Sequence, residues 1–166
     1  MTGGSATVVL GQTGFGANAE NQGGSPAAST LAYPYAPRFD SAGNMWVSDS
    51  LNHHVLMYPQ VSLATNDPAA TVELGQPAGA SAFTSNTSNN PTPGAGTLYL
   101  PKGLALDSSG RLFVLDAGND RTLVFAPPFS NGMAATLVIG QPNFTTNISG
   151  SGAANLGYGA AGVATY

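Results

Sequence analysis

The chain has 166 residues, enough for one domain of ordinary size. Charged residues make up 7% of it, far below the roughly 25% of typical soluble domains. Because 42% of the residues are hydrophobic, the chain can build a core and does not have the composition of a disordered protein. The net charge of −4, with only four cations scattered along the chain, excludes a basic surface that could neutralise several phosphates, so we expect no nucleic-acid partner.

The chain contains no cysteine, which excludes disulfides, thiolate zinc sites and cysteine nucleophiles. Its apolar runs are shorter than the ~18 residues of a membrane-spanning helix, so we expect no membrane span. The first residues, MTGGSATVVLGQ, lack the charged and apolar regions of a signal peptide. A weakly charged surface rich in Ser, Thr, Asn, Gln and Gly is common in secreted bacterial proteins, which favours an extracellular location without fixing one.

Two sequence patterns recur along the chain. ATVVLGQ at 6–12 returns as ATVELGQ at 70–76 and as ATLVIGQ at 135–141. Between these copies, FDSAGNMWVSDSLNHHVLMY (39–58) matches LDSSGRLFVLDAGNDRTLVF (106–125). Self-similarity at a fixed period is the signature of a repeat architecture, and the 22 glycines and 12 prolines predict many turns between short strands.

In chain order, the repeats predict a strand at 6–11, a unit over about 31–76 and a second unit over about 98–141. The strands of the second unit are expected at 102–107, 111–116, 121–126 and 135–140, because these apolar runs are separated by turn residues. Residues 1–12 would be the last strand of a preceding unit, and residues 155–166 the first strand of a following one. Four-stranded antiparallel sheets repeated in series are the blades of a β-propeller. We therefore predict an all-β fold, a single propeller segment over 1–166 with two complete blades and flanking strands.

One known family resembles this pattern. GLALDSSGRLFVLDAGNDRTLVF (103–125) resembles the NHL repeat, which has an apolar strand, Asp-x-x-Gly, an apolar-aromatic strand, Asp-x-x-Asn-x-Arg and a third strand. The 39–58 copy fits too, with His54 in the place of Arg121. The resemblance implies that the second motif holds the turn between the second and third strands, with Asn in a left-handed conformation. The residues concerned are Asp49, Asn52 and His54 in one copy and Asp116, Asn119 and Arg121 in the other.

The two histidines also allow a catalytic interpretation. His53 and His54 are adjacent, and Asp49 precedes them, as in sites where an aspartate orients a histidine general base. The equivalent copy favours a structural role for His54, which replaces Arg121 and retains the ability to donate to Asp49. His53 has no structural role that the repeat explains, because its equivalent is Asp120.

Metal binding is the next candidate chemistry. Asp40 and Asp107 end the first strand of each unit, where Asp-x-x-Gly most simply forms a capped turn. Six-bladed propeller lactonases, which resemble this architecture, hold calcium in a central channel with carboxylate and amide oxygens, so a calcium site that includes these aspartates is an alternative. The sequence has no dense calcium-loop spacing, and the simplest expectation is that no cofactor is bound.

Tyr33, Tyr35 and Tyr99 precede or begin the first strands and are the best candidates for ligand binding at an end surface. Three functions follow from these observations. The leading one is a non-catalytic propeller scaffold that binds a protein or glycan and assembles with itself, because two blades leave open edges. The alternatives are a calcium-dependent lactonase with His53 or His54 as base, and a self-assembling structural protein.

Overall fold

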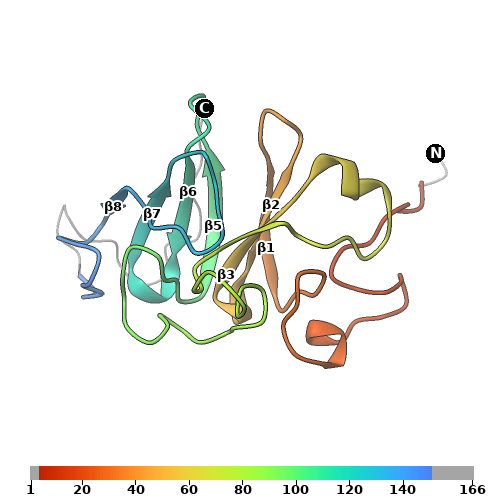
Figure 1. The fold of residues 1–166 in the computed structure, drawn as a ribbon, viewed down its shortest axis with the longest axis horizontal. Coiled ribbons are helices and arrows are strands. Elements are labelled where there is room, and N and C mark those ends of the chain that lie inside the picture. Colours follow the sequence, from red (N-terminus) through yellow and green to blue (C-terminus); the bar gives the residue numbers. More distant parts are fainter. Residues whose placement is uncertain (1–3, 151–166) are drawn as a thin grey trace.

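The computed structural model describes residues 4–150 and shows an all-β chain with little helix (Figure 1). Its first sheet comprises β1 (Pro34–Phe39), β2 (Met45–Asp49), β3 (His54–Tyr58) and β4 (Val72–Leu74), hydrogen-bonded in that order. Its second sheet comprises β5 (Pro101–Leu106), β6 (Leu112–Asp116), β7 (Arg121–Phe125) and β8 (Leu137–Ile139) in the equivalent order. All neighbouring strands within the two sheets are antiparallel.

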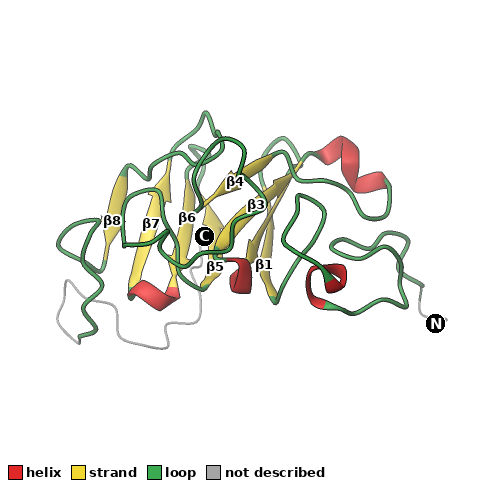
Figure 2. Ribbon diagram, turned by 60° about the horizontal axis from the view of Figure 1, so that its bottom comes forward, coloured by secondary structure: helices red, strands yellow, loops and turns green. Residues whose placement is uncertain are grey.

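Short 3₁₀ segments punctuate the strands (Figure 2). They are η1 (Glu20–Gly23), η2 (Ser50–Asn52), η3 (Gln60–Ala64) and η4 (Ala117–Asn119). The segments η2 and η4 are equivalent, since each forms the turn between the second and third strands of its sheet. Within residues 4–150, no helix is long and apolar enough to cross a membrane.

The predicted strands of the second unit are confirmed to within two residues at each end, and both units form four-stranded antiparallel sheets as predicted. The two sheets remain separate, and no closed sheet forms among residues 4–150. The predicted first strand at 155–166 lies outside the described residues.

Residues 6–11, for which the sequence predicts a strand, form no strand within residues 4–150. Residues 6–10 pair with no strand in the described part of the structure, and Gly11 makes one isolated bridge with Thr30. A strand needs a neighbour to satisfy its backbone groups, and the sheet that this segment was expected to complete is not present among the described residues.

The core lies where the two sheets face each other. Alternation along the strands gives each sheet two faces. In the first sheet, the face towards the second sheet carries Trp46, Val55, Val72 and Leu74, and we call it face A. Face A packs against one face of the second sheet, which carries Leu112, Val114, Leu123 and Phe125. We call this second type face B, because its equivalent in the first sheet is the side opposite face A.

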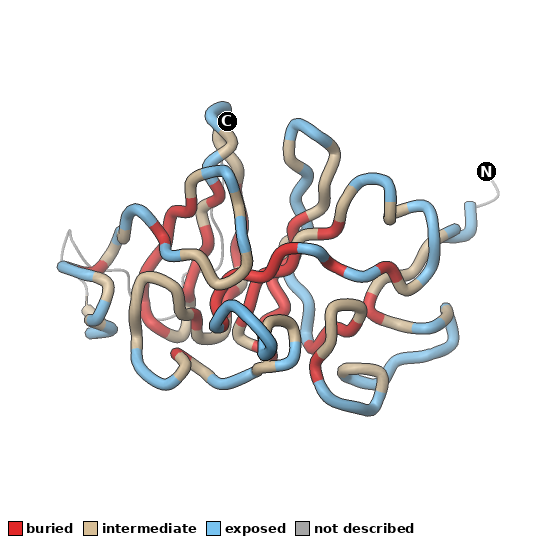
Figure 3. The backbone as a smooth tube through the Cα atoms, in the orientation of Figure 1, coloured by how far each residue is buried: buried red, intermediate tan, exposed pale blue. Residues whose placement is uncertain are grey.

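The residues of the first sheet that are equivalent to this face B form a separate cluster at the other side of that sheet. They are Met45, Val47, Leu56 and Tyr58, packed with Leu10, Leu31, Leu63 and Phe83. Strand β5 lies against both β1 and β2, so the first strands of the two sheets are neighbours. Figure 3 shows buried residues concentrated in β2, β3, β6 and β7, whereas β1 is largely exposed.

Candidate functional site

The two Asp-x-x-Asn turns have nearly the same geometry. In the first sheet, Asp49 Oδ1 accepts a hydrogen bond from the Ala32 backbone N–H at 2.6 Å. In the second, Asp116 Oδ1 accepts from the Tyr99 N–H at 2.7 Å. Both carboxylates are fully buried. Each aspartate therefore fixes the chain that enters its sheet, as the sequence motif predicts.

The asparagines extend this network to the loop before each sheet. Asn52 and Asn119 each donate to Oδ2 of the aspartate in their own turn at 2.7 Å. Asn52 also exchanges two amide hydrogen bonds with Asn21, at 2.8 and 3.0 Å, and Asn119 does so with Asn89, at 2.6 and 3.1 Å. These partners were not predicted from the sequence, because they lie in loops outside the aligned motifs.

The left-handed position was predicted one residue too early. It is occupied by His53, with φ 57°, and by Asp120, with φ 50°, rather than by the asparagines. The asparagines lie inside the 3₁₀ turns, where their side chains make the bonds described above.

The last residue of each motif differs between the sheets. Arg121 Nε donates to Asp116 Oδ2 at 2.7 Å, and its NH2 group donates to the carbonyls of Gly94 and Thr97, both at 3.0 Å. A further bond joins its NH1 group to the Phe144 carbonyl. Burial raises the pKa of the Asp116 carboxyl, and the Arg121 charge together with three donated hydrogen bonds opposes that shift.

His54 makes a smaller set of contacts. Its Nε2 lies 2.9 Å from Asp49 Oδ2, and its Nδ1 is buried without a hydrogen-bond partner. Both side chains have 0% exposure, so a substrate cannot reach them. The pair resembles an oriented catalytic histidine only in sequence, since its position is that of a structural ion pair in the other sheet.

His53 has a structural contact that the repeat did not reveal. Its Nδ1 accepts a hydrogen bond from the Leu100 N–H at 3.3 Å, and its ring packs edge-to-face on Tyr99 with centroids 5.3 Å apart. Burial lowers the pKa of His53, which favours the neutral ring that such an acceptor requires. His53 therefore links the first sheet to the residues that lead into β5 of the second sheet.

The carboxylates proposed for calcium are engaged in their own turns. Asp40 accepts from the Ala42 and Asn44 backbone N–H groups, the Asn44 side chain and Trp46 Nε1. Burial of Asp40 works against ionisation, but the hydrogen bonds from Asn44 and Trp46 outweigh it and lower the pKa of this carboxyl.

Asp107 is held in the same way in the second sheet. Its Oδ1 accepts from the Ser109 and Arg111 N–H groups, and Arg111 forms an ion pair with its Oδ2 at 2.6 Å. The Arg111 backbone bond and then its side chain lower the pKa of Asp107. A calcium ion would have to displace these donors. Within residues 4–150, no group of three or more His, Asp or Glu side chains could hold a metal ion.

The three tyrosines do not share one role. Tyr33 and Tyr35 are 59% and 42% exposed at the start of the first sheet. Tyr99 is half-buried against His53 and lies over Gly118, where an added Cβ would approach its ring to 2.4 Å. The exposed pair remains available to a ligand, whereas Tyr99 belongs to the contact between the sheets.

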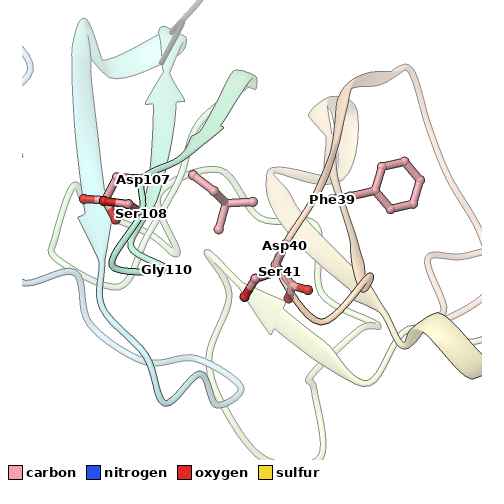
Figure 4. Close-up of a pocket in the computed structure, with 7 residues that line it drawn as sticks. Phe39, Asp40, Ser41, Asp107, Ser108 and Gly110 are labelled. Atoms are coloured by element: carbon pink, nitrogen blue, oxygen red, sulfur yellow. The ribbon is translucent and has the colours of Figure 1, made fainter. Parts of the chain in front are cut away.

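A cleft of about 380 Å³ opens between the β1–β2 and β5–β6 turns, and a hollow of about 360 Å³ shares several of its lining residues. Asp40 and Ser41 form one wall, and Asp107, Ser108 and Gly110 form the other (Figure 4). Leu106 also lines the cleft. Phe39 is at the rim, with its ring turned away from the cleft. The cleft was not predicted, although the repeated Asp-Ser-x-Gly turn is the sequence signal for both walls. Its size is that of a small-ligand site.

Comparison with known proteins finds no matching protein-family model and no matching curated protein.

Proposed function

We propose that this chain is a non-catalytic scaffold and binding module of the NHL-type β-propeller kind, which assembles with further sheets of the same kind through the apolar side chains exposed on the outer side of each sheet. The observation that carries the proposal is that equivalent apolar residues are buried where a neighbouring sheet covers them and exposed where none does.

At the end of the first sheet, Phe39 is 62% exposed, whereas its equivalent Leu106 packs against the shared core. Phe39 pairs with Met45 across β1 and β2 and so lies on face B of the first sheet. No preceding sheet covers this face among the described residues, because the first sheet is the first that the structure describes.

The opposite end shows the same effect on face A. Val72 and Leu74 of β4 are 9% and 0% exposed, because the second sheet covers them. Their equivalents in β8, Leu137 and Ile139, are 48% and 43% exposed. The exposed residues on each outer face are thus of the kind that is buried at the interface between the two sheets.

Face A packed on face B is a contact that can repeat indefinitely or close into a ring. Four-stranded sheets stacked in this way around an axis form propellers, typically of about 4–8 blades. Two sheets alone leave part of one face of each kind exposed, at Phe39 on one and at β8 on the other, and exposed apolar patches of this type mark interaction sites. The Asp-x-x-Asn turns of the NHL-like motif support the same architecture, since their six motif residues are buried and hydrogen-bonded: Asp49, Asn52, His54, Asp116, Asn119 and Arg121.

The absence of a catalytic role rests on accessibility. His54 and Asp49 are buried in a structural pair, and the Asp40 and Asp107 carboxylates are saturated by their turns. The lining of the cleft between the turns includes the hydroxyl side chains of Ser41 and Ser108 and the apolar side chain of Leu106, a mixture that suits a protein loop or a glycan.

Sedimentation velocity over a range of concentrations tests the assembly. We expect the wild-type chain to associate, and the triple variant Phe39→Ser, Leu137→Ser, Ile139→Ser to sediment as a smaller species. Val61→Ser is the matched control, because Val61 is 82% exposed but lies on η3, outside both faces. A wild-type chain that stays monomeric throughout contradicts the assembly.

Calorimetric titration with calcium and a lactone hydrolysis assay with and without chelator test the absence of catalysis. We expect neither heat nor turnover. Chelator-sensitive turnover that is lost in His53→Ala contradicts the scaffold function.

A further inference from the structure

Asparagine is followed by glycine at a single place in the sequence, Asn131-Gly132, in the connection between β7 and β8 (residues 126–136). An asparagine in this position loses its side-chain amide most readily, because glycine has no side chain to hinder attack by its own backbone nitrogen. Both residues are partly exposed, so water reaches them. The pair therefore has the composition and the access of a modification site.

The structure holds both reacting groups in hydrogen bonds with Glu73 of β4. The Glu73 N–H donates to Asn131 Oδ1 at 2.9 Å, and the Gly132 N–H donates to the Glu73 carbonyl at 3.0 Å. Loss of the amide requires the Gly132 nitrogen to give up its proton and to approach the side-chain carbon of Asn131. The first bond fixes the side-chain amide and the second occupies the N–H, so both must break before the reaction can begin.

The same contact requires the glycine. Gly132 has a φ of +65°, and an added Cβ would clash with the backbone nitrogen of Ala78 and would lie 2.9 Å from the Ala78 Cβ. A side chain at this position would push the connection away from the residues that follow β4. The close approach of the two chain segments thus needs the residue that makes Asn131 reactive.

Apolar packing keeps this part of the connection on the core. Phe129 and Met133 pack against the cluster between the sheets, and the Phe129 ring meets Trp46 edge-on with centroids 4.6 Å apart. The connection can lift off while β7 and β8 remain paired, because that pairing involves residues 122–124 and 137–139. Local opening of this kind requires less free energy than unfolding of the whole chain.

We propose that Asn131-Gly132 is a deamidation site, which is closed while β4 is bound to the connection and reacts with water when this contact opens. In the open state, a base removes the Gly132 N–H proton and the nitrogen attacks Asn131 Cγ. The Cγ–Nδ2 bond breaks, the amide nitrogen takes up a proton and leaves as ammonia, and a cyclic succinimide remains. Water then adds to either imide carbonyl and gives aspartate or isoaspartate at position 131, with no change of oxidation state.

The two products leave different amounts of the contact. Aspartate keeps an oxygen that accepts from the Glu73 N–H. Isoaspartate adds one carbon to the backbone between position 131 and Gly132, so the two bonds with Glu73 no longer form together. Each opening that ends in isoaspartate therefore loosens the contact between the sheets irreversibly. The site lies within one chain, so it does not depend on the assembly proposed above.

Peptide mapping by mass spectrometry measures the reaction in the full chain, kept at one pH and temperature either folded or in guanidinium chloride. We expect Asn131 to lose its amide at least ~10-fold more slowly in the folded chain. Asn66 is the internal control, since it also precedes the fourth strand of its sheet but is followed by Asp67. In the unfolded chain it should react more slowly than Asn131. Isoaspartate at position 131 should remove the protection of the Glu73 amide from deuterium exchange.

Phe129→Ala tests the opening step. It should speed the reaction of the folded chain by roughly threefold or more, because the contact with Trp46 is lost. Phe15→Ala is the matched control, since Phe15 is 58% exposed and its loss should leave the rate unchanged. Met133→Ala takes the place of Phe129→Ala if that variant does not fold.

Three results would overturn the gated site. They are equal rates in the folded and unfolded wild-type chains, equal acceleration by Phe129→Ala and Phe15→Ala, and a folded Phe129→Ala or Met133→Ala chain that reacts no faster than the wild type.

Discussion

The first and second sheets are built from equivalent residues but differ in which strands are covered. Strand β1 is exposed along almost its whole length, whereas β5 is mostly buried, and β4 is buried whereas two of the three residues of β8 are exposed. Sequence similarity thus determines the conformation of each sheet, whereas burial depends on its neighbours. The same comparison separates the polar turns, because Arg121 reaches four partners and His54 reaches one.

The largest expected difference between the sheets lies in these turns. Arg121→Ala should lower the free energy of unfolding by ~3–5 kcal/mol, because it leaves the buried Asp116 charge without its cation. His54→Ala should cost about 1–3 kcal/mol, since the Asp49 carboxylate keeps its bonds from Ala32 and Asn52. Urea unfolding of both variants measures the difference, and equal losses would show that the two turns contribute alike.

The fourth strands give the next contrast. Leu74→Ala should destabilise the chain by about 2–5 kcal/mol, because Leu74 is fully buried between the sheets. Ile139→Ala should cost less than ~1 kcal/mol, because Ile139 is 43% exposed. A large loss at Ile139 in a dilute sample would mean that a neighbour already covers β8.

Glu73 gives the first sheet a pH dependence that the second sheet lacks, because the equivalent residue there is Val138. Burial raises the pKa of Glu73 from 4.5 to about 8, and its Oε2 has no hydrogen-bond partner. The folded chain therefore keeps this proton after the unfolded chain has released it. Its stabilising effect is complete below pH 4.5 and is lost as the pH rises to about 8.

Thermal unfolding of the wild type and of Glu73→Val across this window isolates the effect. The stability of the wild type relative to the variant should fall by about 1.4 kcal/mol for each pH unit. Glu73→Gln is the control of similar shape, since it should also remove the dependence. Parallel pH profiles for the wild type and Glu73→Val would show that Glu73 does not titrate in this window.

The smallest effect is expected at the outer turns. Arg111→Asn places in the second sheet the residue that the first sheet has at Asn44. The Arg111 side chain is 47% exposed, so its ion pair with Asp107 should contribute less than ~1 kcal/mol and should weaken with salt. Urea unfolding at low and high ionic strength measures both, and a loss as large as that of Arg121→Ala would be inconsistent with the distinction between exposed and buried pairs.

Much of the fold follows from the sequence because short-range signals determine it. Apolar runs separated by Asp-x-x-Gly and Asp-x-x-Asn give all eight strands of the two sheets. The strand at 6–11 was predicted on the same grounds, yet pairing depends on a neighbour that the segment's own residues do not specify. The hydrogen bond from the Leu100 N–H to the His53 ring was missed for a related reason. The residue equivalent to His53 is Asp120, which has no imidazole nitrogen, so comparison of the repeats does not reveal the bond.

The candidate sites were less predictable than the strands. The Asp49–His54 distance agrees with the structural interpretation of the motif, but only the structure shows that both side chains are inaccessible. The cleft between the turns depends on how the sheets pack, which the separate motifs do not encode.

Strand β4 is bonded on two sides, to β3 within its own sheet and through Glu73 to the connection of the next sheet. A cooperative folding unit of this chain therefore extends beyond one sheet, because β4 is bonded to parts of both sheets. Separation of the sheets would require β4 to break bonds to one of them, so nearest-neighbour coupling of the kind seen in linear repeat proteins should be strong here. In calorimetry, such coupling merges the melting of both sheets into one transition.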